Sequence, residues 1–321
     1  MSILKMSFTG RRSLALTATA VAVALAATGC GGDSGGAPTL PGNPGLGGDG
    51  VVAQSVYDAA PVATDADIPA GSTMDAIRKR GYLNIGGSLD APLLAQQNPV
   101  SGTIEGFDAD MAKLLAKYII GKPEVKTTTI GTQTREAMLQ AKSVDAVFQT
   151  YTITPQRATQ VAFAGPYLTS GLAVGVRKDD TSIKSVKDLA GKTVIVGANT
   201  PAVTALPSAA PGSKQIAFGT DPQALQALLQ KRGDAYVQDF TLLASGARAN
   251  PGMKVVGEPF TTESYGIGLN KEDTQFKEFV NNWLKKIQAD GTWAKVWEGT
   301  LGSVVEGGAP TPPALGSADG S

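Results

Sequence analysis

The stretch from Asp108 to Gly121, DADMAKLLAKYIIG, shows the pattern on which the fold depends. Its large apolar residues recur at helical spacing, at Met111, Leu114, Leu115 and Tyr118. Gly121 is a typical helix stop. A short strand at Leu83–Ile85 precedes this helix and a strand at Val125–Ile130 follows it. The order strand, helix, strand predicts parallel α/β layers.

The same alternation continues along the chain in two sets. The first set adds a helix at Arg135–Gln140 and a buried strand at Ala146–Phe148. The second set comprises strands at 172–176, 193–196, 235–237, 253–256 and 265–269 and helices from 201, at 222–230, at 240–248 and at 274–288. Two sets within roughly 230 residues predict an α/β protein with two lobes, each of ordinary domain size.

The first 30 residues have the order of a secretory signal: basic residues between Lys5 and Arg12, then an uncharged apolar run, Leu14–Ala27, which is too short to span a bilayer. The segment Leu25–Cys30, LAATGC, resembles a bacterial lipobox. We therefore predict a lipoprotein signal peptide at 1–30, with Cys30 diacylated as the mature N-terminus. An ordinary signal peptide whose cleavage site includes a cysteine is the alternative.

Two segments are predicted to lie outside the lobes. Residues 31–72 and 306–321 are rich in Gly, Pro, Ala and Ser, and they bury too little apolar surface to offset the entropy of ordering. We expect the first to be a flexible tether and the second a disordered tail. Lobe 1 is then placed at 73–170 and 265–305, and lobe 2 at 171–264.

The composition excludes several classes of function. Lys and Arg together number 28, as do Asp and Glu, so no broad field favours nucleic acid. The chain has no histidine, which excludes Ser-His-Asp and Cys-His catalysis and any His-ligated metal. General base chemistry is left to carboxylates, Lys or Tyr. The absence of histidine weighs against an enzyme without proving that the protein is not one. We expect a protein that is not an enzyme and that has no metal and no cofactor.

Polar residues follow three predicted strands, where open α/β sheets bind ligands. Thr150–Arg157 combines hydroxyls with a guanidinium and suits a carboxylate. Thr200 and Pro201 are typical of a helix start whose free amides can face an anion, and Asp239 could hold an ammonium. Each pattern alone fits a capped helix or a solvated side chain equally well. Together they are complementary to a free α-amino acid held between the lobes.

Seven segments extend this pattern over about 74–302: GFDADMA at 106–112, VDAV at 144–147, TITPQR at 152–157, VAFAGPY at 161–167, DLAGKTV at 188–194, GDA at 233–235 with Asp239, and YGIGL at 265–269. In this order they resemble the extracellular solute-binding proteins, family 3, of polar amino acid ABC transporters. The resemblance implies the type II periplasmic-binding-protein fold, with hinge strands near 167–174 and 259–267 and a ligand cleft between the lobes.

Within this family the chain is similar to actinobacterial glutamate-binding lipoproteins, on the segments 150–153, 163–167, 200–202, 290–293 and 309–313. The resemblance implies a lipid-anchored receptor on the extracellular face of the cell membrane that delivers an amino acid to an ABC permease. The chain has no Gly-x-x-x-x-Gly-Lys-Ser/Thr run, so it is not the ATPase of that transporter.

The resemblance also assigns residues to the two α-groups of the ligand. Arg157 would pair with the α-carboxylate, and Thr152 and Thr200 would donate to the same group. The backbone of Thr150 and the carboxylate of Asp239 would hold the α-ammonium.

The side chain of the ligand is expected at a second arginine. Arg135, with Thr132 beside it, matches a position at which binders of acidic amino acids carry arginine, so glutamate is the first candidate. Gln97 stands where the glutamate-like subgroup often has arginine, which leaves glutamine, aspartate and asparagine open. Residues 90–94 lack the aromatic residues that many members place there.

Two alternatives stay open. One is an enzyme on the same scaffold, such as a cyclohexadienyl or arogenate dehydratase, which would need a Glu or Lys proton donor in the cleft. The other is a sensory lipoprotein that binds an amino acid without serving a transporter.

Overall fold

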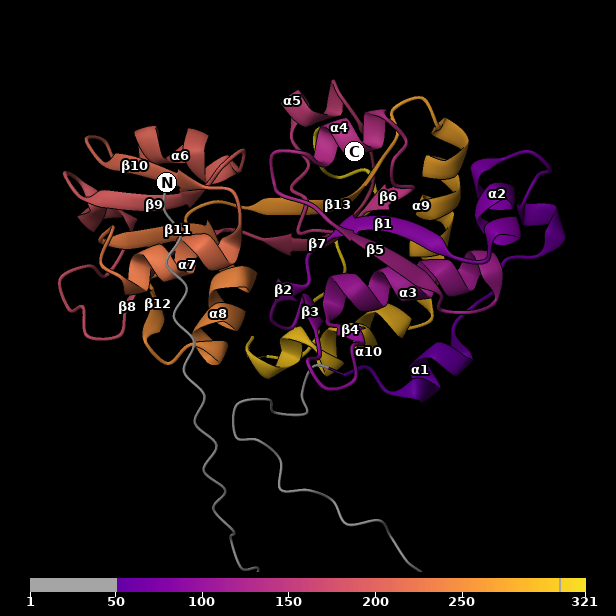
Figure 1. The fold of residues 1–321 in the computed structure, drawn as a ribbon, viewed down its shortest axis with the longest axis horizontal. Coiled ribbons are helices and arrows are strands. Elements are labelled where there is room, and N and C mark those ends of the chain that lie inside the picture. Colours follow the sequence, from indigo (N-terminus) through magenta and orange to yellow (C-terminus); the bar gives the residue numbers. More distant parts are fainter. Residues whose placement is uncertain (1–50, 306) are drawn as a thin grey trace, which may run out of the picture. The chain divides into compact units, whose positions relative to one another are not determined.

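The computed structural model describes residues 51–305 and 307–321. The signal peptide at 1–30, Cys30 and the first part of the predicted tether lie outside these residues. Two five-stranded sheets form the centres of two lobes, with helices on both faces of each sheet (Figure 1). The predicted α/β fold of type II with two lobes is therefore confirmed. No helix within the described ranges is long and apolar enough to cross a membrane.

The sheet of lobe 1 has the strand order β5-β1-β6-β13-β7. Its strands are β1 (Leu83–Gly87), β5 (Val125–Thr129), β6 (Ala146–Val147), β7 (Ala162–Ser170) and β13 (Glu263–Leu269). β1 runs parallel to β5 and β6, whereas β13 runs antiparallel to β6 and β7. The sheet is therefore mixed, because β13 re-enters it after the chain has passed through lobe 2.

The helices of lobe 1 are α2 (Thr73–Arg80), α3 (Phe107–Ile120), α4 (Arg135–Gln140), α5 (Pro155–Ala158), α9 (Thr274–Ala289) and α10 (Thr292–Gly299), with a 3-10 turn η3 (Leu301–Ser303). The predicted apolar stripe of α3 is buried in the larger core. Trp293 of α10 packs edge-on against Phe107, and its indole nitrogen donates to the carbonyl of Tyr167 at 2.8 Å. This contact fixes α3 and α10 against β7.

The sheet of lobe 2 has the order β10-β9-β11-β8-β12. Its elements are the strands β8 (Leu172–Arg177), β9 (Thr193–Gly197), β10 (Lys214–Phe218), β11 (Ala235–Asp239) and β12 (Met253–Val256), the helices α6 (Pro201–Ala209), α7 (Asp221–Leu229) and α8 (Phe240–Ala249), and the turn η2 (Val186–Leu189). α6 covers one face of the sheet, and α7 and α8 cover the other (Figure 1). β9, β10 and β11 are parallel, so their carboxyl ends lie at the same edge.

The chain crosses between the two sheets twice, near the predicted hinges. β7 passes into β8 through Gly171, and β12 passes into β13 through residues 257–262. The crossings contact each other, since the Leu172 amide donates to Thr261 Oγ1 at 2.8 Å. A Cβ at Gly171 would lie 2.1 Å from the Thr261 carbonyl oxygen, so this close approach requires glycine.

Several short elements were not predicted. A small sheet of β2 (Asp90–Ala91), β3 (Ala95–Gln97) and β4 (Ile104–Glu105) covers the start of α3. β10 was missed as well, because this edge strand is largely exposed and has no buried apolar run to mark it. Elements of this size carry too little periodicity to be recognised in the sequence.

The prediction of a flexible tether is wrong for its second half. Residues 51–72 contain a helix, α1 (Gln54–Ala59), and a 3-10 turn, η1 (Asp65–Asp67). Val56 and Tyr57 of α1 are buried in the core of lobe 1, and the Tyr57 hydroxyl donates to Oδ1 of the buried Asp110 at 2.6 Å. A few apolar residues in a segment of low complexity therefore suffice to anchor it, because a complementary surface of lobe 1 receives them.

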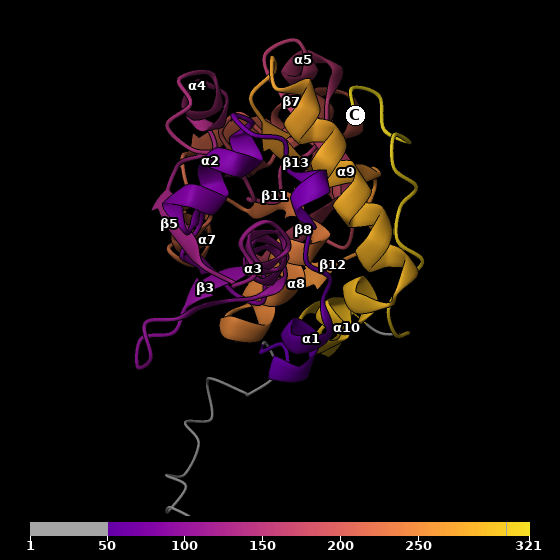
Figure 2. The ribbon, with the colours of Figure 1, turned by 90° about the vertical axis from the view of Figure 1, so that its right-hand side faces the viewer.

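The predicted disordered tail is also corrected. Residues 307–321 contain no helix or strand, yet they lie along α9 (Figure 2). The Gly316 amide donates to the carbonyl of Gly165 at 2.9 Å, and Leu315 packs against the core of lobe 1. The segment pairs with none of the described strands, and it is held in place by its contacts with lobe 1 and by two turns of its own.

The anchoring of α1 gives a prediction for stability. Tyr57→Phe removes one of the two donors to Asp110 Oδ1, the other being Lys113 Nζ at 2.8 Å, so the free energy of unfolding should fall by about 1 kcal/mol in urea titrations of the full chain. Val62→Ala, at a position that is 49% exposed in the same segment, is the control and should change stability by less than about 0.5 kcal/mol. Equal effects of the two variants would show that α1 is not anchored.

Candidate binding site

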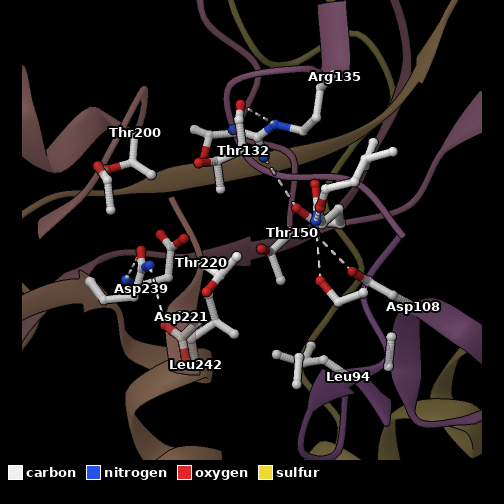
Figure 3. Close-up of a pocket in the computed structure, with 18 of the residues that line it drawn as sticks. Leu94, Asp108, Thr132, Arg135, Thr150, Thr200, Thr220, Asp221, Asp239 and Leu242 are labelled. Atoms are coloured by element: carbon white, nitrogen blue, oxygen red, sulfur yellow. Dashed lines mark hydrogen bonds between the residues drawn. The ribbon is translucent and has the colours of Figure 1, made fainter. Parts of the chain in front are cut away.

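A pocket lies between the lobes, where loops after β5 and β6 of lobe 1 face loops after β9, β10 and β11 of lobe 2 (Figure 3). Of the eight predicted site residues, seven line this pocket: Thr132, Arg135, Thr150, Thr152, Arg157, Thr200 and Asp239. The structure thus brings together groups that are separated by more than 100 positions in the chain.

Gln97 is the exception. It is an exposed residue of β3, and its side-chain amide donates to the carbonyl of Gly102 at 3.1 Å, within the hairpin between β3 and β4. It does not line the pocket. The prediction that Gln97 contributes to the site is therefore wrong in this structure, and its neutral side chain carries no information about the ligand.

Arg157 is positioned by the short helix α5, whose N-cap residue Thr154 accepts a hydrogen bond from the Arg157 amide at 3.2 Å. The guanidinium donates at 2.6 Å to the carbonyl of Thr152 and at 2.6 Å to the carbonyl of Asn199, which belongs to lobe 2. Its Nε lies 3.6 Å from Glu136 Oε1. Burial lowers the pKa of Arg157, and the group stays a cation near neutral pH.

Arg135, the first residue of α4, is only 2% exposed. Its guanidinium donates to the carbonyls of Thr132 at 3.2 Å, Gln149 at 3.3 Å and Asn199 at 3.4 Å. Burial, followed by the charge of Arg157, lowers the pKa of Arg135 to about 9. The carbonyls are neutral, so they orient this charge without cancelling it.

The two guanidinium groups lie side by side. Both stand over the ring of Tyr151, with Cζ of Arg135 at 4.2 Å and Cζ of Arg157 at 4.9 Å from its centroid. Both also donate to the same oxygen, the carbonyl of Asn199. One anionic group can therefore meet both arginines at once.

Asp239 is the acidic residue assigned to the opposite end of the ligand, and it lines the same pocket. It ends β11, is 4% exposed, and its Oδ1 has no hydrogen-bond partner among the described residues. Burial, and next the charge of Glu263, raise the pKa of Asp239 to about 8. A buried carboxylate with an unsatisfied oxygen at the pocket wall is a receptor for a cation or for a hydrogen-bond donor.

Asp108 was not predicted as a site residue, although it lies in the GFDADMA segment. Its two carboxylate oxygens accept from the Thr150 amide at 2.7 Å and from the Tyr167 hydroxyl at 2.7 Å. These bonds hold Thr150 at a φ of 42°, in the left-handed region. Burial raises the pKa of Asp108 to about 6. Asp108 therefore orients the Thr150 backbone. The sequence gives no signal for this role, because an acidic residue in the first turn of a helix is common for other reasons.

Thr152 and Thr200 contribute hydroxyls from opposite lobes. Thr152 is buried, its carbonyl accepts from Arg157, and its backbone forms an isolated antiparallel β-bridge with Tyr265 of β13. Thr200 precedes α6, and its hydroxyl donates to the carbonyl of Gly197 at 2.7 Å. The predicted helix start at Pro201 is confirmed, although the Thr200 side chain makes no hydrogen bond to the helix that it precedes.

Two further carboxylates line the pocket from opposite lobes, and neither was predicted. Asp221 begins α7 and accepts hydrogen bonds from Tyr236 and Gln238. Burial raises its pKa, and the charge of Asp90 in lobe 1 raises it further. Within residues 51–305 and 307–321, no ion pair includes Asp90 or Asp221. In Figure 3, Asp221 lies across the pocket from Arg135.

Comparison with known proteins identifies related sequences and folds. Residues 83–302 match the family described as bacterial extracellular solute-binding proteins, family 3. A glutamine-binding protein of Geobacillus stearothermophilus is 37% identical over 225 residues, which cover 68% of this chain and 85% of that protein. The glutamate-binding protein GluB of Corynebacterium efficiens is 32% identical over 260 residues, covering 76% of this chain and 88% of that protein.

Solved structures share the fold. The solute receptor for L-cysteine of Neisseria gonorrhoeae superposes with a TM-score of 0.68 at 29% identity, covering 73% of this chain and 95% of that one. The two-lobed arrangement around the pocket is thus the arrangement of known amino acid receptors.

The raised pKa of Asp239 predicts a pH dependence of stability. Between about pH 4 and pH 8 the folded chain keeps a proton on Asp239 that the unfolded chain releases, so the free energy of unfolding should fall as pH rises through this window. Asp239→Asn removes this contribution, so its stability should fall less steeply than that of the wild type in urea titrations from pH 5 to pH 8.5. Parallel profiles for the two proteins would contradict the assignment.

Proposed function

The chain belongs to the bacterial extracellular solute-binding proteins, family 3, and on that premise we propose that it captures a free polar amino acid between its lobes and delivers it to the permease of an ABC importer. The observation that carries the proposal is one pocket with two adjacent guanidinium groups and an unsatisfied buried carboxylate. Together they are complementary to an amino acid zwitterion, because the ligand ammonium favours the ionised form of Asp239.

The α-carboxylate is assigned to Arg157, with Thr152 and Thr200 as neutral donors. For Thr200 the donor is the backbone amide, because its hydroxyl already donates to the carbonyl of Gly197. Asp239 and the carbonyl of Thr150 are assigned to the α-ammonium. The support for this assignment is that all five residues line the same pocket. Charge-assisted hydrogen bonds of this kind contribute roughly 1.5–3 kcal/mol each. Micromolar affinity corresponds to about −8 kcal/mol, which two such anchors and the remaining donors can supply.

Two candidates differ in the ligand side chain. Glutamate is favoured if Arg135 meets a second carboxylate. Glutamine is favoured by two observations: Arg135 stands close enough to Arg157 to share the α-carboxylate, and the facing part of the pocket carries Asp90 and Asp221. Carboxylates accept hydrogen bonds from a side-chain amide and repel a side-chain carboxylate. The charge pattern therefore supports a neutral amide side chain over the glutamate that the sequence favours.

The hinges explain how the ligand is captured between the lobes. With the lobes apart the pocket is open to solvent, and rotation about the crossings at Gly171 and 257–262 brings the loops of lobe 2 onto the ligand. Closure removes the charged groups from water and so strengthens their interaction. The named relatives are binding proteins, which supports capture of a ligand as the function in preference to turnover.

We also infer that the protein is held at the extracellular face of the cell membrane by lipid on Cys30, a residue outside the described range. The LAATGC segment and the extracellular family support this inference. One acyl chain holds a protein only marginally, whereas two anchor it stably. A diacylated Cys30 would keep the receptor beside its permease.

The proposed function is tested by thermal unfolding in the presence of each of the twenty amino acids. The ligand, expected to be L-glutamine with L-glutamate second, should stabilise the protein by about 2.7 kcal/mol at 100 times its dissociation constant. Arg157→Ala should abolish this stabilisation. The matched control is Arg177→Ala, since Arg177 also donates to buried carbonyls but lies outside the pocket. Retained binding in Arg157→Ala, or equal loss in both variants, would contradict the site.

The anchor is tested by metabolic labelling with radioactive palmitate. The wild-type chain should carry label and sediment with membranes, and Cys30→Ala should lose the label and appear in the culture medium or the soluble fraction. An unlabelled wild-type chain would show that the signal peptide is an ordinary one.

A further inference from the structure

We propose that Thr132 and Asn199 form a latch that holds the two lobes closed, so that Thr132 sets the lifetime of the closed state rather than contacting the ligand. Thr132 lies in lobe 1 between β5 and α4, and Asn199 lies in lobe 2 between β9 and α6. The latch is defined by these two residues and their hydrogen bonds across the cleft. The proposal rests on the proposed function only for the choice of ligand.

Thr132 both donates a hydrogen bond to lobe 2 and accepts one from it. Its hydroxyl donates to the carbonyl of Ala198 at 2.7 Å, with the carbonyl of Gly219 at 3.3 Å as a second acceptor. Its own carbonyl accepts from the side-chain amide of Asn199 at 3.2 Å. A hydroxyl has one proton to donate, and the Ala198 carbonyl already receives it. The Thr132 hydroxyl therefore has no proton left for a ligand oxygen while the lobes are closed.

Asn199 connects lobe 2 to the arginine pair. Its φ is 55°, a left-handed conformation that asparagine adopts more readily than most residues. This conformation directs its carbonyl to both guanidinium groups, at 2.6 Å from Arg157 Nη2 and 3.4 Å from Arg135 Nη2. The side-chain amide also lies 3.5 Å from Glu136 Oε2. Lobe 2 thereby presents a backbone oxygen to the same cations that are assigned to the ligand carboxylate.

The two halves of the latch have one consequence for binding. The arginines are assigned to the ligand carboxylate, and they also donate to the Asn199 carbonyl of lobe 2. Loss of the contacts between the lobes therefore weakens the contacts with the ligand, and the reverse also holds. Opening must break the bonds of Thr132 and Asn199 before the ligand leaves. The latch therefore acts on the dissociation rate, whereas association proceeds through the open state and depends on it weakly.

Thr132→Val tests the latch, because valine has the shape of threonine without the hydroxyl. We expect the closed fraction to fall, measured by fluorescence energy transfer between labels on the two lobes, and the dissociation rate of L-glutamine or L-glutamate to rise about three- to tenfold. The order of preference among amino acids should stay unchanged. Thr132→Ser keeps the hydroxyl and should resemble the wild type. Asn199→Gly keeps the left-handed backbone but loses the side-chain amide, and should show a smaller effect in the same direction.

The outcomes separate the possibilities. If Thr132→Val changes the order of preference among amino acids while the closed fraction stays the same, Thr132 is a ligand contact and the latch is overturned. An unchanged closed fraction with unchanged dissociation also overturns it. If the wild type binds no amino acid, the proposed function fails, and the energy transfer of Thr132→Val measured without ligand still decides whether the latch exists.

Discussion

The burial of two like charges side by side is the constraint on which the binding site depends. Arg135 and Arg157 both contact the ring of Tyr151, and one carboxylate, that of Glu136, lies at 3.6 Å from Arg157. Removing charge from water is unfavourable unless other groups replace the hydration. Here backbone carbonyls do so, one of them contributed by the opposite lobe. The arrangement leaves a positive site that an anionic ligand group would complete.

The fold supplies this arrangement through strand ends and hinges. Parallel strands of both lobes end at the pocket, so loops that are distant in sequence face one another. The crossings at Gly171 and 257–262 are the two chain connections between the sheets of the lobes. The same topology gives each lobe a mixed sheet, which is why the expectation of purely parallel layers was incomplete.

Prediction from the sequence succeeded where a pattern is long or repeated. The helix α3 and the strands β9 and β11 were all found, because each buries a nearly continuous set of residues. It failed at residues 51–72, where only a few apolar residues anchor α1 against lobe 1. Composition measures how much apolar surface a segment has, but not whether a complementary surface exists to receive it.

The sequence by itself determined the two-lobed α/β class, the order of the longer strands and helices and seven of the residues at the pocket, because apolar periodicity and polar residues after strands are local properties. Only the tertiary structure decided which groups face one another. It removed Gln97 from the site, added Asp108 and the pair Asp90 and Asp221, and showed the Thr132 hydroxyl bonded to lobe 2. These relations depend on the distance between segments far apart in the chain, and the packing of the lobes about their hinges sets that distance.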